Sequence, residues 1–332
     1  INPMQYGTIV HYILERFFGE YTKEEYLSLE EDKFQKIVCA YLAEYAVKYF
    51  GEEQLESNSF TYCLKTILDN VMYLMKHIME ELSQSEFFVA DCELKIGEDI
   101  PSYTIVLPDG HKIAVCGSVD RVDIMQKADI TYLRIIDYKT GTKQFKLSDI
   151  LYGINLQMLL YLHSIEASGG DKYGEIVPAG ILYMPATVPY ISSDSLKSID
   201  KLPDELNKKL KMNGLLLKDT EIIHGMDKTD VATYIPVKIK AGEPVSSTSL
   251  ATLAEFGKIF KKVDMLIAEM GKNIYNGNIE AKPLKGGHDS CEYCPYDSVC
   301  AYRQSNPITC FSVDNKTVIE EITNEINGKE EE

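Results

Sequence analysis

Strand-like segments, one amphipathic helix and a further strand follow one another in the middle of this chain, and this order most constrains its fold. The helix is expected at about 148–167 and the last strand at 177–184, because their apolar residues repeat with helical and strand periods. Strands interrupted by a helix predict an α/β fold, in which a mixed sheet is flanked by helices. The earlier strand segments are rich in β-branched and aromatic residues and are separated by Gly, Pro and polar residues; they span 87–96, 102–107, 112–125 and 131–140.

Helical sequence flanks this region on both sides. Residues 3–50 and 57–84 place apolar side chains such as Ile9 and Ile13 on one helical face, and a further helix is expected at 250–274. The residues between the last strand and that helix are mixed and polar. We therefore divide the chain into a helical N-terminal part (1–85), a sheet core (86–190), an insertion (191–248), a C-terminal helix with a cysteine segment (249–312) and an acidic tail (313–332).

Composition limits the class of protein. Of the 332 residues, 45% are apolar, so a sizeable core can form. No apolar run reaches the about 18 residues that a membrane-spanning helix needs. The net charge of -17 argues against non-specific adhesion to nucleic acid through a broadly basic surface, although a local basic channel is compatible with it. The chain starts at Ile1 without a signal peptide, so we expect a cytoplasmic protein and a fragment of a longer one.

The segment IIDYKTG at 135–141 carries the strongest chemical signal. Residues two apart on a strand point the same way, so Asp137 and Lys139 share a face and Tyr138 points to the other. A carboxylate beside an ammonium can hold a divalent cation next to a water molecule. Asp137 offers a hard oxygen to Mg²⁺, and Lys139 can orient or deprotonate the water and offset phosphate charge.

The preceding strand offers a second carboxylate, Asp120, in the segment GSVDRVD at 117–123. Asp120 lies at the end of an apolar stretch typical of a central strand, and a buried carboxylate needs a partner, such as a cation shared with Asp137. Arg121 and Asp123 lie on the opposite face and can pair with each other. An isolated Asp-x-Lys pattern is most often a surface ion pair, but the neighbouring GSVDRVD segment favours the metal site.

GSVDRVDI followed by IIDYKTG resembles the PD-(D/E)XK nuclease superfamily in its RecB-type branch. Three further segments resemble parts of this family and occur in its order: GTIVHYILERF with His11, LQMLLYL with Gln157 and Tyr161, and the strand VPAGILYM. The resemblance covers residues 5–185. It implies a restriction-endonuclease-like core that hydrolyses DNA with the help of Mg²⁺.

The resemblance also implies a role for each matching residue. Lys139 would be the catalytic lysine, and Gln157 and Tyr161, four apart on one helix face, would line the DNA groove. The expected metal ligands are the side chains of His11, Asp120 and Asp137 and the carbonyl of Tyr138.

Other interpretations of these residues stay open on sequence alone. A lone His on an amphipathic helix is often a packing residue, and Tyr161 can equally belong to the core. Glu15 lies one turn from His11 and could orient its ring. Glu93, on an earlier strand, is a further candidate for a metal ligand or an outer hydrogen-bond partner.

Cys291, Cys294 and Cys300 form a C-x2-C-x5-C pattern. Close thiolates suit a site for zinc or an iron–sulfur cluster, and a disulfide framework is a poor alternative without a secretion signal. The resemblance favours a [4Fe-4S] cluster, whose fourth Cys in AddAB-type helicase–nucleases precedes the histidine helix. The first Cys here is Cys39, so that fourth ligand is missing from this fragment. Cys310 is the alternative.

Three functions follow from these observations. The first is a Mg²⁺-dependent DNA exonuclease domain that works with an AddA-like partner subunit of a helicase–nuclease in double-strand break repair. The second is a CRISPR-associated RecB-type exonuclease, which the long N-terminal helices and the insertion fit poorly. The third is a catalytically inactive structural or DNA-guiding domain, against which the complete set of Asp120, Asp137 and Lys139 argues.

Overall fold

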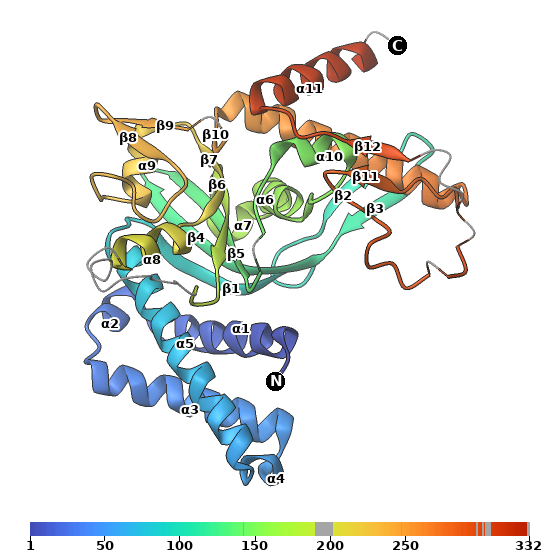
Figure 1. Cartoon of the computed structure of the whole chain (residues 1–332). Helices are drawn as coiled ribbons and strands as arrows, with labels where there is room; N and C mark the ends of the chain where they lie inside the picture. Colours follow the sequence, from blue (N-terminus) through green and yellow to red (C-terminus); the bar gives the residue numbers. More distant parts are fainter. Residues whose placement is uncertain are drawn as a thin grey trace.

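A six-stranded mixed sheet forms the centre of the protein, in the order β1-β4-β5-β6-β7-β10 (Figure 1). The computed structural model describes residues 1–141, 143–189, 202–246, 248–296, 298–300, 302 and 307–330. Adjacent strands are antiparallel except for the parallel pairs β5–β6 and β7–β10. The strands of this sheet are β1 (Phe88–Ile96), β4 (Gly117–Lys127), β5 (Ile130–Lys139), β6 (Glu175–Pro185), β7 (Asn213–Leu217) and β10 (Leu250–Ala251).

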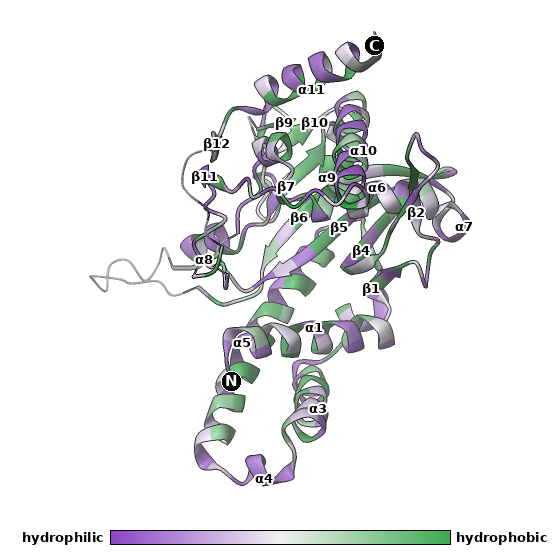
Figure 2. Ribbon diagram, turned by 90° about the vertical axis from the view of Figure 1, so that its right-hand side faces the viewer, coloured by the Kyte–Doolittle hydropathy of each residue, from purple (hydrophilic) through white to green (hydrophobic). Residues whose placement is uncertain are grey.

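Helices cover both faces of the sheet (Figure 1). The N-terminal helices lie on one side, and α3 and α5 extend away from the sheet (Figures 1 and 2). They are α1 (Pro3–Glu20), α2 (Lys23–Leu27), α3 (Glu31–Phe50), α4 (Glu52–Leu55) and α5 (Asn58–Ser83). The other side carries η1 (Leu147–Tyr152), α6 (Gln157–Ser168), α7 (Gly170–Tyr173), α10 (Leu253–Tyr275) and α11 (Asn315–Glu330). This arrangement confirms the expected α/β, restriction-endonuclease-like fold.

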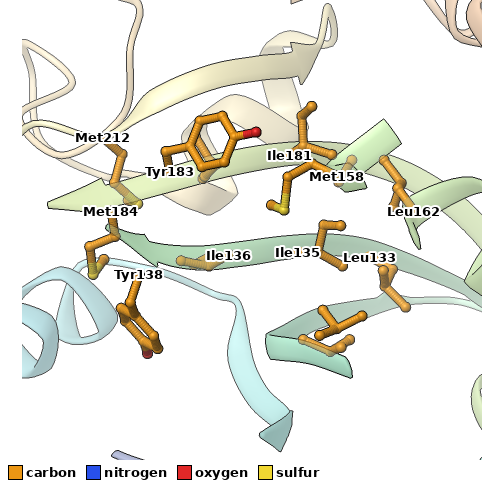
Figure 3. Close-up of a cluster of buried hydrophobic side chains, with 14 of the residues drawn as sticks. Leu133, Ile135, Ile136, Tyr138, Met158, Leu162, Ile181, Tyr183, Met184 and Met212 are labelled. Carbon is orange, nitrogen blue, oxygen red and sulfur yellow. The ribbon is translucent and has the colours of Figure 1, made fainter. Parts of the chain in front are cut away.

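Successive residues in the middle of β5 and β6 are buried, so side chains on both faces of these strands are covered, as expected for a sheet with helices on both sides. Ile135 of β5 and Ile181 of β6 lie beside Met158 and Leu162 of α6 in one buried cluster (Figure 3). On the opposite face, α1 buries apolar side chains such as Ile9. β4 and β5 are therefore held between two packed layers of helices. This packing fixes the positions of the polar residues on these two strands.

Several elements differ from the sequence-based expectations. The expected strand 112–125 is divided at Cys116 into β3 (Lys112–Val115) and β4, and β2 (Tyr103–Val106) pairs with β3 outside the central sheet. The expected helix at 250–274 starts at Leu253, since the two residues of β10 precede it. Periodicity alone did not separate these short strands from their neighbours, because each is defined by its pairing with another strand, β3 with β2 and β10 with β7.

The segment 191–248, interpreted above as an insertion, contributes β7 to the central sheet, where it pairs with β6. Residues 191–201 and Ser247 lie outside the described residues. The remainder of this segment and of the C-terminal region forms small elements, namely α8 (Leu202–Leu210), α9 (Thr220–Met226), β8 (Lys238–Lys240), β9 (Glu243–Val245), β11 (Leu284–Gly286) and β12 (Ile308–Cys310).

The acidic tail is more ordered than its composition suggests. Its helix α11 packs on α10 and buries Val318 and Ile322 completely. Hydrogen bonds from Lys262 to Glu325 and from Lys258 to Thr323 join the two helices. Among the described helices, none is long and apolar enough to cross a membrane.

A fully buried ion network lies between α5 and the strands β4 and β5. Its members, all without solvent exposure, are Glu81, Arg121, Asp123 and Arg134. Arg121 Nε donates to Asp123 Oδ1 at 2.6 Å, and Arg134 Nη2 donates to Glu81 Oε1 at 2.6 Å. The pairing of Arg121 with Asp123 was expected from their shared face. The network extends it across the sheet and to a helix, so it fixes β4 and β5 next to the residues Asp120 and Asp137.

Candidate metal centre

The candidate site lies where β4 starts and β5 ends. Helix α1 contributes residues to its lining, among them His11. A cavity of about 750 Å³ opens there, and its lining includes His11, Glu93, Ser118 and Lys139. The pairing of β4 with β5 ends at Arg121 and Ile136. Beyond that point the strands are no longer joined by ladder hydrogen bonds, so their polar side chains can take part in other interactions.

Three side chains from different elements bring potential ligand atoms within 4.8 Å of one another: His11 of α1, Glu93 of β1 and Asp120 of β4. His11 Nδ1 lies 3.0 Å from Glu93 Oε1, and His11 Nε2 lies 3.6 Å from Asp120 Oδ2. One imidazole and two carboxylates provide nitrogen and hard oxygen donors at one point. This is a chemically suitable set for a divalent cation.

Glu93 reaches this set through an unusual backbone conformation. Its φ is +51°, in the left-handed region that non-glycine residues rarely adopt. Such a conformation persists only where the surroundings hold it, and strained residues of this kind cluster at functional sites. Here the carboxylate is held on both sides, by His11 and by Ser118 Oγ, which donates to Glu93 Oε2 at 2.9 Å. These contacts hold the pKa of Glu93 below its usual value, with the His11 hydrogen bond as the largest cause.

Asp120 carries a carboxylate that the protein compensates only in part. Burial raises the pKa of Asp120 to about 6, and the nearby charge of Asp137 adds to this effect, while His11 opposes it. Its Oδ2 accepts a hydrogen bond of 2.9 Å from the backbone N–H of Tyr138. Burial lowers the pKa of His11, but the hydrogen bond to Glu93 and the negative charges around it outweigh burial and raise that pKa. The site therefore favours positive charge.

Asp137 and Lys139 share a face of β5, as expected, and form an ion pair. Lys139 Nζ lies 2.5 Å from Asp137 Oδ2. The Asp137 side chain is 6% exposed and that of Lys139 is 28% exposed, so the ammonium is the partner that faces the cavity. Asp137 stands outside the set of His11, Glu93 and Asp120, because its carboxylate is directed to Lys139 instead.

A model of the PD-(D/E)XK nuclease superfamily matches residues 1–301 of the sequence. The chain belongs to the PD-(D/E)XK nuclease superfamily. The match includes the α1 histidine, both strands of the candidate site and the following helix. The family resemblance inferred from the separate motifs is thereby confirmed, as is the fold that it implied.

Several bacterial relatives share the same description, as a subunit of an ATP-dependent helicase/deoxyribonuclease. The relative from Thermoanaerobacter sp. (strain X514) is 34% identical over 313 residues, which cover 91% of this chain and 27% of that protein. Those from Alkaliphilus oremlandii and Clostridium kluyveri are 32% and 33% identical, and each alignment covers 98% of this chain and 29% of the relative. The chain thus spans less than a third of the length of these relatives.

Within this nuclease domain, Glu93 orients the ring of His11, whereas Glu15 lines the cavity without a hydrogen bond to His11 among the contacts of the described residues. The side chain of Tyr138 is buried on the opposite face from Asp137, and its ring meets His11 edge-on, with centroids 5.7 Å apart. Tyr138 therefore contacts the site in two ways, through this ring and through its N–H. The metal-binding role of its carbonyl stays a prediction.

Gln157 and Tyr161 lie on α6, outside the residues that line the cavity of the site. Gln157 is the first residue of the helix and is exposed. Tyr161 is half-buried against Gly117, the first residue of β4, and Ser118 follows Gly117 directly. Tyr161 is thus placed to support the segment that holds Glu93. A role of either residue in contacting DNA stays a prediction.

We expect Gly117→Ala to displace Tyr161. A Cβ at position 117 would lie 2.3 Å from Tyr161 Oη and 2.6 Å from Tyr161 Cζ, so the ring must move. The expected loss in the free energy of unfolding is about 1–3 kcal/mol, typical of overpacking, and urea denaturation measures it. In a Tyr161→Ala background the same substitution should cost much less, because the clash is gone.

Gly257→Ala in α10 is the matched control for this substitution. A Cβ there meets no atom within 4 Å. It is expected to leave stability unchanged or to raise it by up to about 1 kcal/mol, since Ala favours a helix over Gly. Equal costs of Gly117→Ala with and without the Tyr161 ring would show that the contact between them does not determine the effect.

The cysteine triplet lies in the C-terminal segment, remote in sequence from the sheet. Cys291 and Cys294 are half-buried and Cys300 is exposed, while Cys310 is buried at the end of β12. Among the described residues, the candidate ligands whose atoms lie within 4.8 Å of one another are His11, Glu93 and Asp120. No cysteine belongs to this group. The assignment of the triplet to a zinc ion or an iron–sulfur cluster stays a prediction.

Proposed function

We propose that this chain is the metal-dependent deoxyribonuclease domain of a helicase–nuclease, and that it acts as a DNA exonuclease. The observation that supports this most directly is the convergence of His11, Glu93 and Asp120 beside the Asp137–Lys139 pair. These residues come from four different elements, and a charge cluster of this composition has no evident purpose in packing.

The donor set fits a divalent cation such as Mg²⁺. The side chain of Asp120 is only 16% exposed and its negative charge is only partly compensated, as its raised pKa indicates, so a cation would supply the missing positive charge. His11, Glu93 and Asp120, whose ligand atoms converge, would hold the ion, with Asp137 and the Tyr138 carbonyl as the additional candidates. A Mg²⁺ ion bound there would polarise the phosphate and lower the pKa of a water molecule.

The residues of the chain itself perform the remaining steps. Lys139 directs its ammonium into the cavity, where it can hold the attacking water and offset the charge that develops on the phosphate. Asp137 fixes this ammonium by an ion pair. Glu93 orients the imidazole of His11 through Nδ1, so that Nε2 is turned toward Asp120.

The names of the relatives support the wider context of this proposal. Each is described as a subunit of an ATP-dependent helicase/deoxyribonuclease, a description that favours the helicase–nuclease over the CRISPR-associated alternative. We further propose that the chain works in the cytoplasm in double-strand break repair, with an AddA-like helicase as partner. A partner would also explain how a chain of net charge -17 is kept on DNA.

The cysteine triplet is part of the same proposal. Cys291, Cys294 and Cys300 would hold a [4Fe-4S] cluster together with a fourth Cys from the part of the relatives' length that this chain does not span. Iron and sulfide quantified on the longer protein would test this assignment separately from nuclease activity, and zinc alone would contradict it.

We expect degradation of linear DNA to depend on a divalent cation. With Mg²⁺ the chain, or the longer protein that contains it, should release nucleotides from a labelled linear duplex or single strand. Chelation should lower the rate by about 100-fold or more, and an excess of Mg²⁺ should restore it. A closed circular DNA of the same sequence is the control, and an exonuclease spares it. Equal rates with and without chelator would contradict the metal-dependent mechanism, and no activity in the assembled complex would favour the inactive alternative.

A further inference from the structure

An aromatic wall lies next to the candidate metal centre. Tyr12 of α1 and Tyr45 and Tyr49 of α3 line the same cavity as His11 and Glu93. The ring centroids of Tyr12 and Tyr45 are 5.2 Å apart, and those of Tyr45 and Tyr49 are 4.4 Å apart. Tyr49 is 55% exposed although its neighbour Tyr45 is buried. The wall therefore presents an accessible ring whose position is fixed by a buried one.

Hydrogen bonds and charge keep this wall in place. Tyr12 Oη donates to Glu44 at 2.7 Å, and Arg16 Nη1 donates to the same carboxylate oxygen at 3.1 Å. Lys48 Nζ lies 5.1 Å from the centroid of the Tyr49 ring. An aromatic ring that is pre-oriented and accompanied by a cation suits the stacking of a flat base whose phosphate lies nearby.

A lysine-lined cavity of about 690 Å³ adjoins the metal centre on its other side. Its described lining contains no Asp or Glu, although the whole chain carries a net charge of -17. The four lysines that line it are Lys143, Lys208, Lys209 and Lys211. Lys143 approaches the Tyr183 ring at 5.1 Å, and Lys211 donates to two backbone carbonyls, so the two ammonium groups have defined positions.

The two cavities meet at the end of β5. Thr140, Gly141 and Lys143 line both of them. A path therefore leads from the tyrosines, past His11 and Lys139, to the lysines. Aromatic rings on one side of a hydrolytic centre and ammonium groups on the other match the two kinds of surface that a polynucleotide presents, its bases and its phosphates.

We propose that a single strand of DNA lies along this path, with a base stacked on Tyr49 at one side of the centre and its phosphates held by Lys143 and Lys208 at the other. The proposal deepens the proposed function, on which it rests. A single strand is favoured over a duplex because a duplex keeps its bases stacked inside, where they cannot reach Tyr49. The charged side chains among the described lining of this cavity are all lysines, so the lysine side would hold the phosphate backbone without reading the sequence.

Binding without hydrolysis tests the path independently of nuclease activity. Fluorescence anisotropy with a labelled oligothymidylate, in chelator, measures the affinity of the wild-type chain and its variants. Tyr49→Ala is expected to weaken binding by about 5- to 150-fold, the range found for the loss of one stacked base. On an abasic oligonucleotide of the same length, this substitution should have no effect, because no base is present to stack.

Substitutions on the lysine side should weaken binding whether or not the oligonucleotide carries bases. The double variant Lys143→Gln and Lys208→Gln is expected to weaken the binding of both oligonucleotides. It should also reduce the slope of log affinity against log salt by about 0.7 for each charge removed. The matched controls are Tyr62→Ala and Lys65→Gln on α5, which are exposed and line neither cavity.

These outcomes separate this proposal from the nuclease assignment. A Tyr49→Ala variant that binds oligothymidylate like the wild type, or a wild type that binds a duplex as tightly as a single strand, overturns the path whatever the nuclease assay gives. A loss of affinity confined to the base-containing oligonucleotide supports it even if hydrolysis is not detected. Circular dichroism of each variant verifies that a loss of binding does not reflect unfolding.

Discussion

Lys139→Ala is expected to lower the rate of Mg²⁺-dependent DNA hydrolysis by about 100- to 1,000-fold, the range found when one preorganised group that stabilises the transition state is removed. Lys139 lies at the end of β5 with its ammonium on the cavity, and the expected role of that group is to hold the attacking water and offset phosphate charge. Initial rates on labelled linear DNA at saturating Mg²⁺ measure the effect. Circular dichroism verifies that the variant is folded, because Lys139→Ala leaves the 6%-exposed Asp137 side chain without this ion-pair partner.

Lys95→Ala is the matched control for this prediction. Lys95 lines the same cavity but points to the surface, where its ammonium pairs with Glu98 at 3.0 Å. Its loss should change the rate by about twofold at most, as for other exposed ion pairs. Rates for Lys139→Ala and Lys95→Ala that fall within tenfold of each other would remove Lys139 from the catalytic machinery. Asp137→Ala should resemble Lys139→Ala, because it removes the ion-pair partner that fixes the ammonium, together with a proposed metal ligand.

Breaking the buried ion network is expected to have the largest effect on stability. Glu81→Gln leaves Arg121 and Arg134 with one full negative charge, that of Asp123, in a region with no solvent exposure. Removing one partner from a buried charge network typically costs about 3–5 kcal/mol, since the remaining charges keep their desolvation penalty. Against a total stability of about 5–15 kcal/mol, this would lower the midpoint of urea denaturation strongly.

The electrostatics of the network support this expectation. Burial by itself would raise the pKa of Asp123, but Arg121 and Arg134 outweigh it and hold that pKa below its usual value. The two guanidinium groups also lie over the aromatic rings of Phe18 and Phe87, at 5.8 and 4.9 Å from their centroids. These contacts stabilise cations, so the arginines remain charged when an anion is removed.

Glu80→Gln is the control for Glu81→Gln. Glu80 precedes Glu81 on α5 but is exposed, and its neutralisation should change the free energy of unfolding by about 0.5 kcal/mol at most. Similar unfolding curves for the two variants would mean that the network contributes little. If Glu81→Gln destabilises as expected, metal-dependent activity should fall with it, because Arg121 adjoins Asp120 and the network fixes both strands of the site.

The sequence alone determined the fold class and two local ion pairs, one of them in the candidate site. Alternating and periodic apolar residues predicted the central strands and α6, because a strand or helix with one buried face repeats its apolar residues at a fixed interval. The same two-residue period placed Asp137 with Lys139 and Arg121 with Asp123, and both pairs are ion pairs in the structure. These relations are local, so they could be derived from the spacing of a few residues.

Only the tertiary structure decided which distant residues complete the site. Glu93 joins His11 and Asp120 because its backbone adopts a positive φ and β1 pairs with β4, and no spacing in the sequence encodes either fact. The structure also extended the pair of Arg121 and Asp123 into a network with Glu81 and Arg134, which lie 40 residues before and 13 residues after Arg121. Contacts over such separations depend on how helices and strands pack, and packing involves the whole chain rather than the pattern of any one segment.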